Sequence, residues 1–213
     1  MFEIEKVVLE KNLYYRGELI LKYTISYPRI ISNLYIYSTR KFNSFNRMIA
    51  LSLKMYAEKD LFNESKEIYE YNHSNGYPIM VYELNYDFEI TYNDNFILSL
   101  FSNEYIFTGG AHGSTVRKSQ NWDMKLGEQF KLDSVFKDDP NYLLFILRDI
   151  IRQIELQIEQ DSQQYFDNYC CLVLDTFNPN QFYLYDKNTI VIFFGQYDIA
   201  PYSSGIPTFK IPI

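Results

Sequence analysis

The sequence predicts an α+β fold, in which antiparallel β-sheets built from hairpins and a meander pack with two main helices. Residues 82–92 alternate apolar and polar side chains, as a half-buried strand requires. Two long stretches, about 39–71 and 140–160, instead repeat apolar side chains every three or four positions. Strand-like runs also follow one another directly, which favours α+β architecture over a wound parallel sheet.

The chain is expected to begin with two paired antiparallel strands, 2–9 and 18–27. Arg16-Gly17 has the chemistry of a turn, and Pro28 should close the second strand because proline cannot donate to a strand ladder. The helix at about 39–71 follows and ends near Asn72–Gly76. It contains no proline, and its apolar positions are Phe42, Phe45, Ile49, Leu53 and Tyr56.

The middle of the chain predicts a meander. Asn93-Asp94-Asn95 has hairpin-turn chemistry and should join strand 82–92 to a partner strand at 96–107. The glycine-rich stretch "FTGGAHGS" then connects that strand to a third one at 114–124. A turn at 125–127 and a short strand through Leu132 complete the series.

The last third predicts a helix lying across a sheet. Asp139-Pro140 is a typical helix start, since the Asp carboxylate can accept hydrogen bonds from the free N–H groups of the first turn, and proline suits the first helical position. Strands are expected at 181–185, 189–195 and 208–213. The helix should face them with one apolar stripe, formed by Leu143, Leu147, Ile150, Ile151, Ile154 and Ile158.

Composition and charge exclude some functions. The net charge of −7 and the pI near 4.9 argue against nucleic-acid binding and favour basic partners. Cys170 and Cys171 lie in an apolar stretch and are interpreted as buried thiols. The N-terminal sequence shows no signal peptide, and no apolar run approaches the length of a transmembrane segment. The sequence as written therefore predicts either a cytoplasmic chain or one from which an N-terminal part has been removed.

Sequence motifs for catalysis and for cofactors are missing. The two histidines, His73 and His112, do not occur in an H-E-x-x-H pattern, and no C-x-x-C spacing is present, so no metal site is expected. Neither a phosphate-binding loop nor a G-x-S-x-G nucleophile motif occurs, so the sequence predicts no cofactor and disfavours an enzyme.

The loop "FTGGAHGS" leaves two interpretations open. His112 hydrogen-bonds the loop backbone while the glycines supply positive φ angles, or the exposed N–H groups and the imidazole together contact a ligand. An enzymatic alternative, a hydrolase acting on a cell-wall polymer, would place His112 beside a carboxylate such as Asp198 or Asp123.

A second stretch, "GQYDIAPYSSGIPTFKIP", predicts a sharply shaped surface loop because glycine and prolines follow an apolar strand. Tyr197 and Tyr202 either present their rings to a sugar or a partner protein, or pack into the core.

Together, "FTGGAHGS", "NWDMKLGEQFKLDSVF" and "QYDIAPYSSGIPTFKIP" resemble a bacterial family of unknown-function domains. That family also occurs in the extracellular part of lysozyme-sensing anti-sigma factors and beside the catalytic domain of a peptidoglycan deacetylase. The resemblance divides the chain into a deacetylase-associated N-terminal segment, residues 1–118, and a C-terminal unknown-function domain, residues 119–213, expected to pack as one compact unit.

The resemblance implies a noncatalytic recognition domain at the cell envelope, outside the cell or on its surface, with a lysozyme-like basic protein or cell-wall glycan as partner. The residues that match the family motifs are the expected contacts with ligand or partner: Gly109, Gly110, His112, Gly113, Tyr197, Ala200, Pro201, Tyr202 and Gly205.

Overall fold

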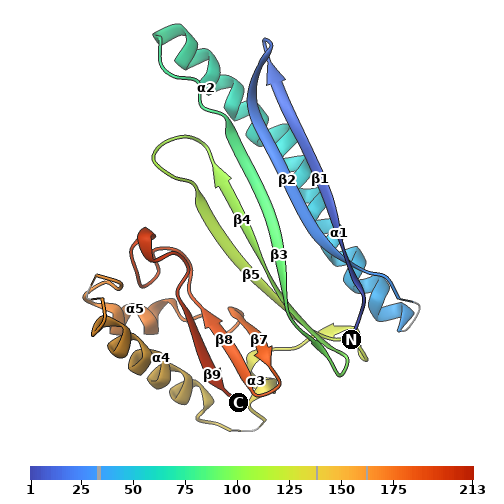
Figure 1. Cartoon of the computed structure of the whole chain (residues 1–213), viewed down its shortest axis with the longest axis vertical. Coiled ribbons are helices and arrows are strands. Elements are labelled where there is room, and N and C mark those ends of the chain that lie inside the picture. Colours follow the sequence, from blue (N-terminus) through green and yellow to red (C-terminus); the bar gives the residue numbers. More distant parts are fainter. Residues whose placement is uncertain (33–34, 138, 162) are drawn as a thin grey trace. The chain divides into compact units, whose positions relative to one another are not determined.

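The computed structural model describes residues 1–32, 35–137, 139–161 and 163–213 and confirms the α+β class, with nine strands in two sheets (Figure 1). One sheet has the strand order β1-β2-β3-β4-β5-β6, and the other β7-β8-β9. The contacts divide the chain into two compact units. Unit 1 comprises Met1–Phe88, Ser102–Thr115 and Lys125–Gly127, and unit 2 comprises Glu89–Phe101, Val116–Met124 and Glu128–Ile213.

In unit 1, β1 (Ile4–Tyr15) and β2 (Glu18–Ile30) form the expected antiparallel hairpin. Arg16 and Gly17 make its two-residue turn, both with positive φ, as a tight hairpin requires. The expectation that Pro28 ends β2 is wrong, because the strand continues to Ile30 and Pro28 pairs with Lys6. Pairing of β2 with β3 covers only Leu21–Ile25, so Pro28 needs no donor on that side.

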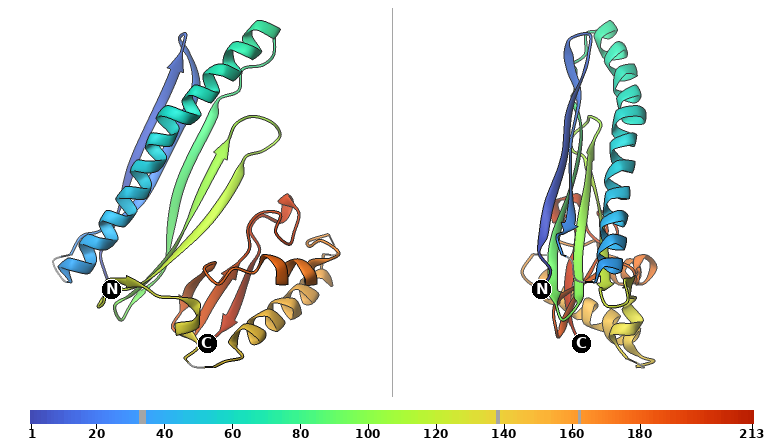
Figure 2. Two further views of the ribbon diagram at one scale, coloured as in Figure 1. Left: turned by 180° about the vertical axis from the view of Figure 1, so that it is seen from behind. Right: turned by 90° about the vertical axis from the view of Figure 1, so that its right-hand side faces the viewer.

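A continuous helical run follows β2. It consists of α1 (Ile36–Tyr56), the π-helical turn η1 (Ala57–Leu61) and α2 (Phe62–Asn75), close to the predicted 39–71. The run covers one face of the β1–β2 hairpin (Figure 2). It leads into β3 (Tyr82–Asp94), which pairs with β2 in parallel. An all-antiparallel sheet was therefore the wrong expectation at this one pair, since a helical crossover returns the chain in the same direction.

The core of unit 1 lies between the hairpin and this helical run. Alternate residues of β2 and β3 face small and apolar residues of the helices, which lets the backbones approach closely. The buried set is Leu21, Tyr23, Ile25, Ala50, Ala57, Leu61, Tyr82, Leu84 and Tyr86.

The hairpin turn between β3 and β4 (Ile97–Phe107) lies one residue later than predicted. Asn95 and Phe96 form it, and both have positive φ, the signature of a type I′ turn. Next come β5 (Ser114–Asp123) and the short β6 (Glu128–Gln129). The strand predicted through Leu132 ends earlier, because Leu132 begins the short helix α3 (Leu132–Val135) and is buried there.

Helix α4 (Tyr142–Ile158) packs on the antiparallel sheet of β7 (Phe182–Asp186), β8 (Thr189–Phe193) and β9 (Thr208–Pro212), as predicted (Figure 1). Asp139 Oδ1 accepts a hydrogen bond from Asn141 N at 2.8 Å just before the helix begins. The predicted stripe needs one correction: Ile146 is buried beside Ile150 and Ile154, whereas Leu143 is exposed. The other buried members of this core are Leu132, Tyr165, Val173, Phe182, Leu184, Ile190, Ile192, Phe194, Ile199, Ala200, Phe209 and Ile211.

The sequence did not predict helix α5 (Tyr169–Thr176). Val173 is its buried residue, and Cys170 and Cys171 are both exposed free thiols, so the expectation of buried thiols is wrong. A helix this short that lies at the surface buries only a narrow stripe. Among the residues that the structure describes, no helix is long and apolar enough to cross a bilayer.

Candidate functional site

The glycines of the loop between β4 and β5, in unit 1, have two different structural roles. Gly109 and Gly110 have φ angles of 103° and 88°, which L-residues rarely adopt. Gly113 lies where the backbone passes close to β4: a Cβ there would come within 2.5 Å of the Ile106 carbonyl oxygen and of the Tyr105 ring. The first two glycines allow the chain to turn, and the third allows it to pack.

The ring of His112 is exposed, and its Nδ1 lies 3.1 Å from the carbonyl oxygen of Gly113. A carbonyl only accepts, so Nδ1 must carry the proton in this contact. In a neutral ring, Nε2 is then a hydrogen-bond acceptor. His112 therefore stabilises the turn through one nitrogen, while its ring remains accessible to solvent.

The second loop, in unit 2, contains a turn with an unusual residue at its third position. In the turn Gly195–Asp198, the N–H of Asp198 donates to the carbonyl of Gly195 at 3.3 Å. The Asp198 carboxylate closes the turn again by accepting a hydrogen bond from Gly195 N at 2.6 Å. Tyr197 has φ 66°, at a position that type II turns reserve for glycine or asparagine.

The rings of Tyr197 and Tyr202 lie together on this loop. Their centroids are 5.9 Å apart with the planes inclined by 35°, and Tyr197 is 53% exposed. Tyr202 begins the 3₁₀ turn η2 (Tyr202–Ser204), which follows Pro201 and ends at Gly205, itself at φ 69° and ψ −132°. This conformation is open essentially to glycine alone.

The base of the same loop is anchored in the core. Ala200 is 1% exposed and packs beside Ile199, so it supports the loop and does not present a surface. Ser204 Oγ donates to the Gln164 carbonyl at 2.7 Å. The neighbouring Tyr165 hydroxyl donates to Gln157 Oε1 at 2.6 Å, and burial raises the pKa of Tyr165 to about 12. Tyr197 and Tyr202 thus lie on a loop whose base is held by the core and by the Ser204–Gln164 hydrogen bond.

The predicted site residues fall into two groups. Gly109, Gly110, His112 and Gly113 belong to unit 1, whereas the residues from Tyr197 to Gly205 belong to unit 2. The carboxylate suggested for the enzymatic alternative, Asp198, holds the backbone of its own turn. Asp123 is the last residue of β5, where it pairs with Glu128.

Unit 1 also contains a pocket of about 600 Å³ that the sequence motifs did not predict, lined by residues of β2 and α1. Three arginines surround it, although the chain as a whole is acidic. The spacing of seven residues between Arg40 and Arg47, which places them on one helix face, is a sequence signal that indicates two of the three arginines. The complete lining is Tyr27, Arg29, Arg40, Asn43, Ser44 and Arg47.

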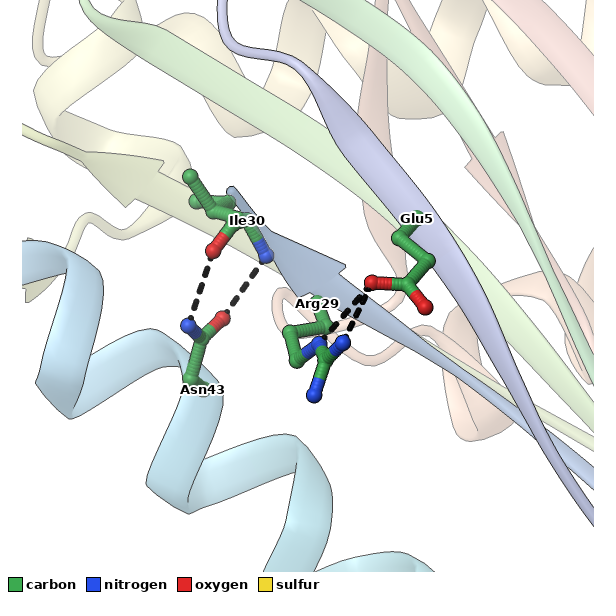
Figure 3. A network of polar contacts seen from close by, with 4 residues as sticks. All are labelled: Glu5, Arg29, Ile30 and Asn43. Atoms are coloured by element: carbon green, nitrogen blue, oxygen red, sulfur yellow. Dashed lines mark hydrogen bonds and ion pairs between the residues drawn. The ribbon is translucent and has the colours of Figure 1, made fainter. Parts of the chain in front are cut away.

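Two polar contacts fix the walls of this arginine pocket (Figure 3). The Asn43 side chain accepts a hydrogen bond from Ile30 N at 2.8 Å and donates one to Ile30 O at 3.0 Å. Across the hairpin, Arg29 Nε and Nη2 donate to Glu5 Oε2 at 3.0 and 2.6 Å.

Comparison with known families divides the chain into two matched segments. Residues 17–115 match the family described as deacetylase PdaC, and residues 133–213 match the protein family of unknown function DUF3298. Among curated proteins, the chain is 30% identical over 121 residues to the peptidoglycan-N-acetylmuramic acid deacetylase PdaC of Bacillus subtilis. The match covers 57% of this chain and 22% of that enzyme.

Solved structures of the DUF3298 family share the fold. A member from Bacteroides fragilis superposes with a TM-score of 0.72 at 20% identity, covering 99% of this chain and 90% of its own. A member from Pseudomonas aeruginosa gives a TM-score of 0.64 at 15% identity, covering 100% and 91%. These matches confirm the resemblance predicted from the sequence motifs: a segment that matches the PdaC family model is followed by one that matches the model of the unknown-function family DUF3298.

Proposed function

We propose that this chain is a noncatalytic recognition module that binds a glycan of the bacterial cell wall through the loop carrying Tyr197 and Tyr202. The relationship to a peptidoglycan deacetylase supports the class of ligand. Because the chain spans only 22% of that enzyme, its deacetylation chemistry is not carried over to this chain.

The conformation of Tyr197 is the observation that carries this proposal. A tyrosine at φ 66° is strained, since the Cβ of an L-residue crowds the backbone there, and glycine or asparagine would relieve the strain. Tyr197 is 53% exposed, so core packing does not explain why a tyrosine stands at this position. Strain held at a surface loop by surrounding hydrogen bonds is typical of a functional position.

The chemistry of the Tyr197–Tyr202 pair suits a sugar. The C–H-rich face of a pyranose ring packs against the electron-rich face of an aromatic ring, and a tyrosine hydroxyl adds a polar contact. Tyrosine also loses little conformational entropy on binding, because it has only two side-chain torsions. In this proposal Pro201 and Gly205 shape the loop, and Ala200 seats it in the core.

The GGAHG loop of unit 1 is proposed as a second contact region with a smaller role. Gly109, Gly110 and Gly113 set its backbone, and His112 is the side chain that we assign to the ligand, because it is exposed on the loop. Replacing His112 with alanine should weaken glycan binding less than replacing Tyr197, because Nδ1 already bonds within the loop.

Co-sedimentation with purified, insoluble peptidoglycan tests the proposal, with soluble disaccharide-peptide fragments used in parallel calorimetry. We expect the chain to sediment with the polymer and to release no soluble fragments from it. Failure to bind either form would overturn glycan recognition. Release of fragments that depends on His112 would instead establish the hydrolase alternative.

A lysozyme-like protein is the second candidate partner, favoured by the net charge of −7. Lysozymes of the c type are basic, and opposite net charges accelerate association. Calorimetry with such a lysozyme at two salt concentrations separates this candidate from the first. Binding of lysozyme without binding of glycan would replace the glycan as the proposed partner.

A further inference from the structure

We infer that the arginine pocket of unit 1 is a binding site for an anionic group, a phosphate or a carboxylate, held by Arg40, Arg47 and Arg29. The inference concerns residues outside the glycan loop and does not depend on the proposed function. It rests on how β2 and α1 place these residues around one pocket, on the contact that joins the strand to the helix, and on the charge of the residues.

Strand and helix periodicity bring the pocket residues together. Tyr27 and Arg29 are on the same side of β2 as the buried Ile25, which is the side that faces the helical run. On α1, the residues that line the pocket are three or four positions apart, so they share one helix face: Arg40, Asn43, Ser44 and Arg47. The end of β2 and the first turns of α1 therefore form opposite walls of the pocket.

The Asn43–Ile30 contact holds these two walls in a fixed relation. The amide oxygen of Asn43 accepts a hydrogen bond from the N–H of Ile30, at the end of β2, and the amide nitrogen donates one to the C=O of the same residue (Figure 3). A two-point contact fixes orientation as well as distance, so the strand and the helix that carry the arginines are held in one relation before a ligand arrives.

The charges of the pocket are only partly compensated. Glu5 pairs with Arg29 and uses its Nε and one Nη, which leaves Nη1 available for a further partner. Within residues 1–32, 35–137, 139–161 and 163–213, neither Arg40 nor Arg47 is paired with a carboxylate. Three guanidinium groups around one pocket repel one another, and a bound anion would offset this repulsion.

The donor set fits an oxyanion. Guanidinium groups form paired N–H···O bonds with phosphate and carboxylate oxygens, and such charge-assisted bonds are the strongest that side chains make. The Ser44 hydroxyl adds a donor, and the Tyr27 ring adds an apolar wall for the rest of the ligand. Phosphate esters and carboxylates share this chemistry, and the experiment separates them.

Titration of the full chain with sodium pyrophosphate and with sodium succinate, at constant ionic strength, tests the inference. The readout is the set of arginine Nε–Hε NMR signals. At least one probe should give saturable shifts at Arg29, Arg40 and Arg47, and saturation by one probe alone identifies the anion. Arg40→Gln or Arg47→Gln should weaken that binding about tenfold.

Two matched variants make the test specific. Arg148→Gln/Arg152→Gln removes the same charge as the Arg40→Gln/Arg47→Gln pair, from exposed helix positions in unit 2, and should leave the affinity unchanged. Glu5→Gln frees Arg29 and should strengthen binding about threefold, whereas Glu10→Gln, on the opposite face of β1, should not.

No saturable shift with either probe would overturn the inference. Equal losses of affinity in the two arginine double variants would do the same, since they would reduce the effect to net charge. Unchanged circular dichroism of the Arg40→Gln and Arg47→Gln variants excludes unfolding as the cause of a loss.

Discussion

The amide of Asn43 bonds both backbone groups of Ile30, accepting from its N–H at 2.8 Å and donating to its carbonyl at 3.0 Å. This single side chain completes the end of β2 and ties it to α1. Backbone groups at the end of a strand have no ladder partner beyond it, so a side chain that supplies both a donor and an acceptor replaces two ladder bonds. The register between strand and helix therefore depends on one half-buried residue.

Replacement of Asn43 with alanine should lower the free energy of unfolding by about 1–3 kcal/mol, because both Ile30 groups lose their partner in a partly buried place. Urea denaturation followed by circular dichroism measures this. Ser44→Ala, at the adjacent exposed position, is the control and should change stability by less than about 0.5 kcal/mol. Equal stability of the two variants would contradict the role assigned to Asn43.

Gly113→Ala should destabilise the protein by about 1–3 kcal/mol, because the new Cβ would meet a backbone oxygen and a tyrosine ring at 2.5 Å. Gly76→Asn provides the comparison. Gly76 has φ 70° and ψ 24°, no atom lies within 4 Å of its would-be Cβ, and asparagine tolerates this conformation. Thermal unfolding should show a clear decrease for the first variant and little change for the second.

Alkaline pH should weaken the fold through three tyrosines. Burial raises the pKa of Tyr23, Tyr82 and Tyr165 to about 12, from an ordinary value of 10. The unfolded chain therefore releases these protons at a lower pH than the folded chain. The contribution of the three hydroxyls to the free energy of unfolding is complete below pH 10 and is lost as the pH rises toward 12. Each tyrosine steepens this loss by at most about 1.4 kcal/mol per pH unit.

Tyrosinate absorbance of native and urea-unfolded protein, recorded through the same pH range, checks this prediction. The native protein should ionise later than the unfolded one, and Tyr165→Phe should reduce the difference. Coincident titration curves would show that these hydroxyls are not protected by the fold.

Local signals predicted the individual elements well. The helical run was expected at 39–71 and extends from 36 to 75, and the Arg16-Gly17 turn forms where its chemistry indicates. The second hairpin turn lies one residue later than predicted, on Asn95-Phe96. Its position was not predictable, because Phe96 adopts a positive φ that its residue type does not favour. Tertiary pairing, rather than local preference, fixes that register.

Features that depend on distant residues were not predictable from local patterns. The parallel pairing of β2 with β3 follows from the crossover helix, and the exposure of Cys170 depends on how α5 lies on its neighbours. The arginine pocket combines β2 with α1 in a chain of net charge −7, and a total charge conceals such a local reversal of sign.

The Tyr197→Gly variant tests the central claim, that Tyr197 is strained in order to present its ring to a glycan. Glycine accepts φ 66° without cost, so we expect stability to rise by about 1 kcal/mol while binding to peptidoglycan is lost. Tyr14→Ala removes a ring of similar exposure, 57% against 53%, from β1 in unit 1, and should bind like the unmodified chain.

The most direct single measurement is therefore co-sedimentation of Tyr197→Gly with insoluble peptidoglycan, beside the unmodified chain and Tyr14→Ala. We expect the unmodified chain and Tyr14→Ala to sediment with the polymer and a folded Tyr197→Gly to stay in solution. Undiminished sedimentation of folded Tyr197→Gly would contradict it.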